Sequence, residues 1–324
     1  MTLAISCAFA TSLDTVDHIV AAERLGYERA WCYDSPPLYP DVWIMLALAA
    51  QRTTRIKLGP GVLIPHLRHV MTNAAAIATM ESLAPSRLVV GIGAGFTGRL
   101  ALGQGAHPWR EVSAYVTALR ALLAGEEVEW EGAVIKMLQP AGFAPARPIT
   151  PPILLAAQGP KGIELAREVA DGVITAVPVG TMPWSAHILQ GTVLDPGEDP
   201  GSERALDAGG HAAALIYHLM YDVASFPDVE TLPGGAEWRR RADAVPERVR
   251  HLAVHDNHLV GLNALDTGVI NGDVMAALGA GAEAGAWQAR LAACEAAGIT
   301  ELIYQPAGRN IERELTTFAT MAGL

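Results

Sequence analysis

Apolar residues along this chain fall into short continuous runs and longer stretches with helical spacing. The short runs rarely alternate with polar residues, and this is typical of strands that are buried on both faces. Two of them, IKLGPGVLI and RLVVGIGAG, lie within residues 55–99 and flank a helical segment, which makes a β-α-β unit with parallel strands. The other predicted strands are 2–9, 28–34, 152–157, 172–177 and 301–307.

Amphipathic helices follow most of these runs. Gly26 and Gly125 come directly after two of them, as glycines do at helix C-termini. Strands that alternate with helices indicate a parallel sheet covered by helices. About seven or eight such units favour a closed barrel, although the pattern also suits an open doubly wound sheet. The predicted helices are 14–25, 41–51, 110–124, 286–297 and 310–322, with another opening at GPKG.

Two regions do not follow the repeat. Residues 178–210 are rich in Gly, Pro and Asp and are interpreted as an insertion after strand six. We place strand seven at 212–221 (AAALIYHLMY), followed by a long connection over 222–285. Long connections in compact domains are usually functional loops or lids. The whole chain, 1–324, is expected to form a single domain.

Composition narrows the class of protein. The 324 residues are 51% hydrophobic and carry a net charge of −11, so nucleic acids and anionic membranes are poor partners. No apolar run approaches a membrane span, and the N-terminus lacks the basic region of a signal peptide. Cys7, Cys32 and Cys294 have no metal-ligand spacing and are expected to be reduced, buried thiols. We expect a soluble cytoplasmic α/β domain of the size of an enzyme.

Glycines mark the end of the third strand. Two glycines in GPGVLIP (59–65) weaken a buried strand unless the backbone bulges or approaches a ligand closely. An ordinary Gly-Pro kink is the alternative. Asp34 ends the second strand, where barrel side chains face the active site, or else it shapes the turn at SPP.

Two further loops suit an anion. GIGAGFTGR (91–99) resembles a dinucleotide fingerprint, but later glycines and Pro108 delay the helix, so a loop whose amides and Arg99 hold a phosphate fits better. QGPKG (158–162) opens a helix with Pro160 in its first turn and Lys161 beside the free amides. A plain βα turn with a surface lysine is the alternative.

Histidines supply the other candidate chemistry. His251, His255 and His258 have the spacing of one helical face and could bind a metal, face a substrate or pack. His218 lies near the end of the predicted strand seven, with Tyr217 and Tyr221 beside it. We expect no metal, because the string lacks an accompanying glutamate base. Neither a nucleophile elbow nor a Walker loop occurs, so acyl transfer and ATP hydrolysis have no support.

Three motifs in order carry a family resemblance: GPGVLIPHLRH, RLVVGIGAGF and AAQGPKGIELAREVADGVI (156–174). Together they resemble the luciferase-like monooxygenase superfamily of flavin and deazaflavin enzymes, and most of all its methylene-tetrahydromethanopterin reductase-like branch. The resemblance implies a (β/α)₈ TIM barrel without a metal. It also implies a non-prolyl cis peptide at Gly61-Val62 behind the coenzyme ring, with Asp34 beside the ring. Deazaflavin members often have a histidine next to this acid, whereas this chain has Ser35.

The resemblance turns these motifs into a set of expected site residues. The catalytic candidates are Asp34, His255 and His218. The expected cofactor-binding residues are Asp34, Gly61, Val62, Ile64, Gly93, Gly95, Phe96, Thr97, Arg99, Gln158, Gly159, Pro160 and Lys161.

The function that the resemblance implies is hydride transfer between coenzyme F-420 and a small organic substrate. One alternative is an FMN-dependent monooxygenase that uses O₂ and receives reduced FMN from a separate reductase. Another is a barrel that binds a ligand or cofactor without catalysis. Family members commonly form homodimers or homotetramers, so a homo-oligomer is expected. The substrate would be set by 178–210 and 222–285, which carry no motif that identifies it.

Overall fold

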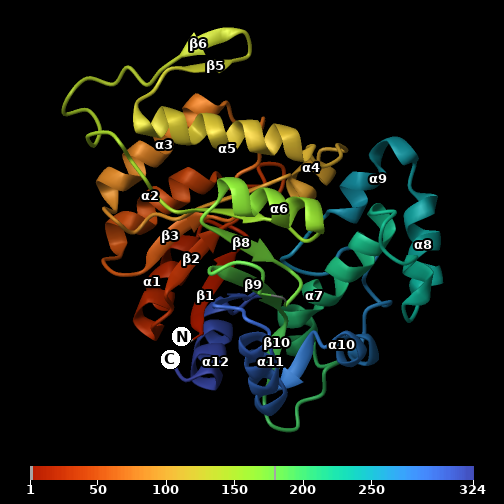
Figure 1. Cartoon of the computed structure of the whole chain (residues 1–324). Coiled ribbons are helices and arrows are strands. Elements are labelled where there is room, and N and C mark those ends of the chain that lie inside the picture. Colours follow the sequence, from red (N-terminus) through yellow and green to blue (C-terminus); the bar gives the residue numbers. More distant parts are fainter. Residues whose placement is uncertain (1–2, 179) are drawn as a thin grey trace.

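Eight parallel strands form a barrel in the computed structural model, which describes residues 3–178 and 180–324. The strands follow one another around the ring in chain order (Figure 1). Bridges between Leu58 and Leu88 and between Leu63 and Ile92 join the third strand to the fourth. The predicted TIM barrel is therefore confirmed. Its strands are β1 (Ala4–Phe9), β2 (Arg29–Cys32), β3 (Lys57–Pro60), β4 (Val90–Gly93), β7 (Ile153–Ala156), β8 (Gly172–Thr175), β9 (Ser185–Gln190) and β12 (Glu301–Gln305).

Helices pack around this ring and bury its outer face. Gly26 and Gly125 end two of them in the left-handed conformation, as the sequence predicts. The main apolar core lies between strands and helices, and a second apolar cluster that includes Trp31 and Leu154 fills the barrel interior. The surrounding helices are α1 (Thr15–Leu25), α2 (Val42–Arg52), α3 (Val70–Leu83), α5 (Trp109–Ala124), α6 (Pro160–Val169) and α12 (Ile311–Ala322).

The prediction for strand seven is wrong. Residues 212–221 belong to a long helix, α7 (Glu203–Asp222), and the seventh barrel strand is β9, inside the predicted insertion. The Ser202 hydroxyl caps α7 by accepting a hydrogen bond from the amide N–H of Ala205. The small buried residues of α7 recur at helical spacing. β9 has the sequence SAHILQ, and its polar residues interrupt the apolar run by which a buried strand is recognised in a sequence.

The insertion therefore follows the seventh strand and not the sixth, and about half of 222–285 is helical. It has its own apolar cluster around Trp238, and its helices α8 and α9 lie to one side of the barrel (Figure 1). A parallel pair, β10 and β11, joins its two ends. Its elements are β10 (Thr192–Leu194), α7, the 3-10 helix η1 (Val229–Thr231), α8 (Gly235–Ala244), α9 (Glu247–Val254), α10 (Gly272–Leu278) and β11 (Gly281–Glu283), before α11 (Ala284–Ala296).

A hairpin that the sequence analysis did not predict projects beyond α5 (Figure 1). It consists of β5 (Val128–Trp130) and β6 (Ala133–Ile135), joined by Glu131 and Gly132. Both turn residues have positive φ, which is the conformation of a two-residue hairpin turn. In the part of the chain that the structure describes, no helix is long and apolar enough to cross a bilayer.

Candidate functional site

The carboxyl ends of neighbouring strands bring the predicted glycine motifs together. Gly93 pairs with Ala156 in the adjacent strand. A Cβ atom added to Gly93 would lie 2.8 Å from the Val62 Cγ2 atom and 3.2 Å from the Ala156 Cβ atom. The peptide between Gly61 and Val62 is cis, as the family resemblance implies. Three separate stretches of sequence thus meet at one edge of the barrel, where active sites of this fold are built.

Asp34 is a buried carboxylate at this edge. Its Oδ1 atom lies 3.0 Å from the guanidinium of Arg68, which also lies 2.9 Å from Asp41. The Oδ2 atom of Asp34 is buried and has no hydrogen-bond partner among the described residues. Burial raises the pKa of Asp34, and the hydrogen bond and charge of Arg68 oppose that rise. The site therefore holds one buried carboxylate oxygen that no described residue satisfies. The sequence analysis did not predict the role of Arg68.

The loop after β4 folds against the loop after β3. Gly95 has φ +83° and begins a short helix, α4 (Phe96–Leu100). Added Cβ atoms on Gly95 and Gly98 would meet the side chain of Ile64 at 2.4 and 2.7 Å, so only glycine permits this approach. The sequence analysis predicts that later glycines and Pro108 delay the helix that follows this loop. The short helix α4 nevertheless starts directly after Gly95, and only α5 begins after the delay.

Arg99 is directed into its own loop. Its Nε atom donates to the carbonyl of Gly105 at 2.5 Å, and its Nη1 atom lies 2.7 Å from the His107 Nε2 atom. The arginine thus orders residues 99–107. Phe96 is exposed, and the hydroxyl of Thr97 lies 3.3 Å from the Nε2 atom of His258.

The start of α6 remains open. Residues 158–161 are exposed, Pro160 occupies the first turn, and Gly159 caps the helix without a side-chain hydrogen bond in the described structure. A Cβ atom on Gly159 would meet no atom within 4 Å. Gln158 holds the neighbouring strand end, because its Oε1 atom accepts from the Ala176 amide at 2.8 Å. Exposed amides beside Lys161 suit a phosphate.

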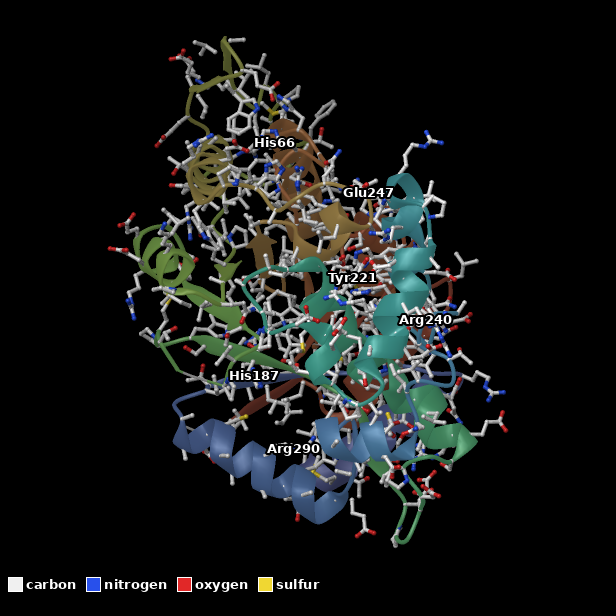
Figure 2. The ribbon with its side chains drawn as sticks, turned by 90° about the vertical axis from the view of Figure 1, so that its right-hand side faces the viewer. His66, His187, Tyr221, Arg240, Glu247 and Arg290 are labelled. Atoms are coloured by element: carbon white, nitrogen blue, oxygen red, sulfur yellow. The ribbon has the colours of Figure 1, made fainter. Side chains whose placement is uncertain are left out.

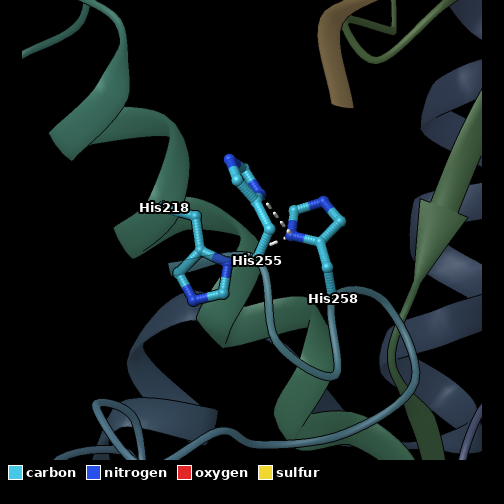
Figure 3. A group of neighbouring side chains, drawn as sticks. All are labelled: His218, His255 and His258. Atoms are coloured by element: carbon cyan, nitrogen blue, oxygen red, sulfur yellow. Dashed lines mark hydrogen bonds between the residues drawn. The ribbon is translucent and has the colours of Figure 1, made fainter. Parts of the chain in front are cut away.

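The histidines do not share one helical face. His255 is the C-terminal cap of α9, His258 lies in the following turn, and His251 points elsewhere, close to Gly103. His218 on α7 completes a buried cluster with His255 and His258 (Figure 3). Burial, followed by the neighbouring histidines, lowers the pKa of His258 well below its usual value.

The two tyrosines near His218 serve the insertion. The Tyr221 ring lies 5.2 Å from the Trp238 ring, and its hydroxyl donates to Asp243 at 2.6 Å. Figure 2 shows it on α7, facing the helix that carries Arg240. Tyr217 donates to the carbonyl of Pro233 at 2.5 Å. Neither contact involves the glycine motifs.

Leu259 fills the barrel mouth, which the sequence analysis did not predict. Its side chain belongs to the interior cluster that also contacts Val62. The Gln305 amide donates to the Leu259 carbonyl at 2.7 Å, and the Tyr33 hydroxyl donates to Gln305 at 3.0 Å. A surface pocket of about 280 Å³ lies beside this segment, with Tyr39, His255 and His258 in its lining.

Comparison with known proteins agrees with this architecture. The sequence model of the family described as luciferase-like monooxygenase matches residues 10–187. A 5,10-methylenetetrahydromethanopterin reductase of Methanolobus tindarius is 34% identical over 160 residues, 47% of each chain. An F-420-dependent glucose-6-phosphate dehydrogenase of Intrasporangium calvum is 30% identical over 209 residues, 59% of this chain and 60% of that protein. The chain spans about half the length of the curated relatives it matches.

Solved structures extend the similarity in fold to the whole chain. The F-420-dependent tetrahydromethanopterin reductase of Methanopyrus kandleri superposes with a TM-score of 0.67, at 18% identity, over 99% of this chain and 98% of that one. The oxygenating constituent of 3,6-diketocamphane monooxygenase from Pseudomonas putida, in complex with FMN, superposes with a TM-score of 0.60, at 13% identity, over 99% and 98%. With its motifs, barrel and sequence match in agreement, the chain belongs to the luciferase-like monooxygenase family.

Proposed function

We propose that this chain is an F-420-dependent oxidoreductase that transfers a hydride between the coenzyme and a small organic substrate. The observation that carries the proposal is the buried Asp34 carboxylate, whose free oxygen lies at the same barrel edge as Gly61 and Val62. Relatives named as F-420-dependent dehydrogenases and methylenetetrahydromethanopterin reductases support the choice of coenzyme.

The residues present fit such a coenzyme. The unpartnered Oδ2 atom of Asp34 can accept a hydrogen bond from a tricyclic ring that rests on Gly61 and Val62. The exposed start of α6 and Lys161 can hold its ribityl phosphate. When bound, the coenzyme supplies two-electron chemistry that no side chain provides.

The protein's own contribution is binding, orientation and charge. Arg68 stabilises the ionised form of Asp34, so this buried carboxylate keeps a hydrogen-bond acceptor. His218 and His255 are the other catalytic candidates, but they are 2% and 3% exposed and each has one ring nitrogen beside a carboxylate. We therefore assign the catalytic position to Asp34 and a positioning role to the histidines.

The same ring and phosphate contacts would serve FMN. A monooxygenase that uses FMN would need reduced FMN from a reductase. Ser35, which stands where deazaflavin members often have a histidine, favours a barrel that binds a ligand or cofactor without catalysis.

A parallel titration separates the candidates. The protein is titrated with F-420 and with FMN, each oxidised and reduced, while fluorescence quenching is followed. Binding of F-420 at about micromolar or tighter Kd, without comparable FMN binding, is expected. Preference for reduced FMN would instead support the monooxygenase, and binding of neither would remove both.

A matched pair of lysine variants locates the phosphate. Lys161→Ala should raise the Kd for the preferred coenzyme about tenfold, because a charged contact is lost. Lys136→Ala, at the residue directly after strand β6 of the projecting hairpin, should leave this Kd unchanged. Equal effects of the two changes would reject the proposed phosphate site. Tight coenzyme binding without turnover of any acceptor would support a barrel that binds without catalysis.

A further inference from the structure

Three buried histidines direct the same ring nitrogen toward one point (Figure 3). The His258 Nδ1 atom lies 3.1 Å from the Nδ1 atom of His218 and 3.4 Å from that of His255. Imidazole nitrogens bound tetrahedrally to Zn²⁺ at about 2.0–2.1 Å are separated by roughly 3.3 Å. The three rings are thus already spaced as ligands of one ion, and each residue is at most 3% exposed.

The outer nitrogen of each ring faces a second polar group. The Nε2 atom of His218 lies 3.1 Å from Asp266, which also accepts the indole N–H of Trp238 at 2.8 Å. The Nε2 atom of His255 lies 3.1 Å from the Oδ2 atom of Asp222. Metal-binding histidines almost always present their other nitrogen to such a partner, which fixes the tautomer and raises ligand basicity.

Counting protons shows why these contacts call for a cation. A neutral imidazole carries one N–H, and in His218 the hydrogen bond to Asp266 places it on Nε2. In His255 the Asp222 carboxylate lies 3.1 Å from Nε2 outside hydrogen-bond geometry, and its negative charge favours the same tautomer. Both inner nitrogens then present lone pairs to His258, whose single N–H can satisfy only one of them. Protonating the rings instead would bury adjacent positive charges. A metal ion at the centre satisfies all three lone pairs.

A second group of metal-binding residue types provides a contrast. His66, His107 and Glu111 also lie close together, but they are more exposed. His107 already uses both ring nitrogens, one toward Glu111 at 2.8 Å and the other toward Arg99 at 2.7 Å. That group is satisfied without an ion, whereas the buried cluster is not.

We propose that the Nδ1 atoms of His218, His255 and His258 bind a divalent transition-metal ion of the Zn²⁺ class. Three imidazoles without a thiolate suit zinc and leave a fourth position for water or a small oxygen ligand. The ion would join α7, the end of α9 and the turn that carries Leu259. The proposal replaces the expectation that the chain binds no metal, and it does not depend on coenzyme binding.

The test measures metal directly, without coenzyme or substrate. The full chain is dialysed against a chelator, reloaded with Zn²⁺ and analysed for bound zinc, and its Co²⁺ form is examined for the visible bands of tetrahedral cobalt. About one ion per chain is expected. His258→Ala and His218→Ala should lose it, whereas His251→Ala, a histidine of α9 outside the cluster, should retain it.

Variants of the outer groups keep the proposal testable if the alanine changes prevent folding. Asp266→Asn and Asp222→Asn should weaken zinc binding about 10- to 100-fold and leave the three ligands in place. Wild-type protein that takes up neither Zn²⁺ nor Co²⁺ would overturn the proposal. So would a folded His258→Ala protein that retains a full equivalent, or a loss in His251→Ala equal to that in His258→Ala.

Discussion

Arg29 and Glu301 form an ion pair at the amino-terminal end of the barrel, with 2.8 Å between their Nη1 and Oε2 atoms. Glu301 is almost fully buried and accepts the indole N–H groups of Trp31 and Trp184 at 3.1 and 2.8 Å. The Arg29 guanidinium lies 4.6 Å from the Trp184 ring centre. Both carboxylate oxygens of Glu301 thus have a hydrogen-bond donor. At the opposite end of the barrel, one oxygen of the Asp34 carboxylate has no partner among the described residues.

Glu301→Gln should destabilise the fold by about 3 kcal/mol, because it leaves a buried arginine without its countercharge. Coenzyme affinity should not change, since the pair lies at the end of the barrel away from the glycine motifs. Thermal unfolding and coenzyme titration measure the two effects. Glu312→Gln, which breaks an exposed pair with Arg24, is the control and should alter stability by less than about 0.5 kcal/mol. Equal changes in the free energy of unfolding in the two variants would show that the buried ion pair contributes no more to stability than the exposed one.

Gly159→Asp should move stability and coenzyme affinity in opposite directions. An aspartate at this uncapped position should stabilise α6 by a few tenths of a kcal/mol, and its charge should weaken phosphate binding at least about tenfold. Gly159→Ser should give the cap without the charge. Unchanged affinity in Gly159→Asp would exclude a phosphate at this helix end.

Asp34→Asn should impair coenzyme binding and turnover with little loss of stability, because Arg68 keeps its contact with Asp41. Asp41→Ala should instead lower stability and leave coenzyme binding and turnover nearly unchanged. Asp41 caps α2 through the amides of Trp43 and Ile44, so its loss should cost about 1 kcal/mol. If coenzyme affinity fell in both variants in proportion to their loss of stability, Asp34 would have a structural role and no direct role in binding.

His211 should make the protein acid-sensitive. Burial lowers the pKa of this histidine to about 4, below its value in the unfolded chain. The unfolded state therefore binds the proton first, so stability is full above about pH 6.5 and falls by about 3 kcal/mol as the pH drops toward 4. His211→Leu should flatten this decline in urea unfolding measured between pH 7 and 4. A decline as steep as that of the wild-type protein would assign the acid sensitivity to other groups.

The apolar runs of most strands predicted a parallel sheet covered by helices, because strands buried on both faces have this pattern. The family resemblance then favoured a closed barrel over an open sheet. β9 lacks the apolar pattern, since Ser185, His187 and Gln190 interrupt the run. The Ala-rich segment 212–221 has the apolar pattern of a buried strand, although Ser202, three residues before Ala205, marks a helix start. The glycine motifs located the barrel mouth, because close backbone approach demands glycine there.

The histidine cluster could not be predicted from the local sequence pattern. His218 and His258 meet only because α7 and the turn after α9 fold together, and the contacts with Asp222 and Asp266 depend on that packing. The spacing of His251, His255 and His258 suggested one helix, but α9 ends at Val254. Leu259 likewise carried no signal, since an apolar residue in a loop does not reveal which cavity it fills.

Leu259 has a kinetic consequence. Its side chain shares the interior cluster with Val62, and Gln305 holds its carbonyl, so a ring bound on Val62 as proposed would compete with this residue for the same interior space. Association would then proceed in two stages, and the observed rate would level off at high ligand concentration instead of rising in proportion to it. The plateau would report the opening rate of a single turn of chain.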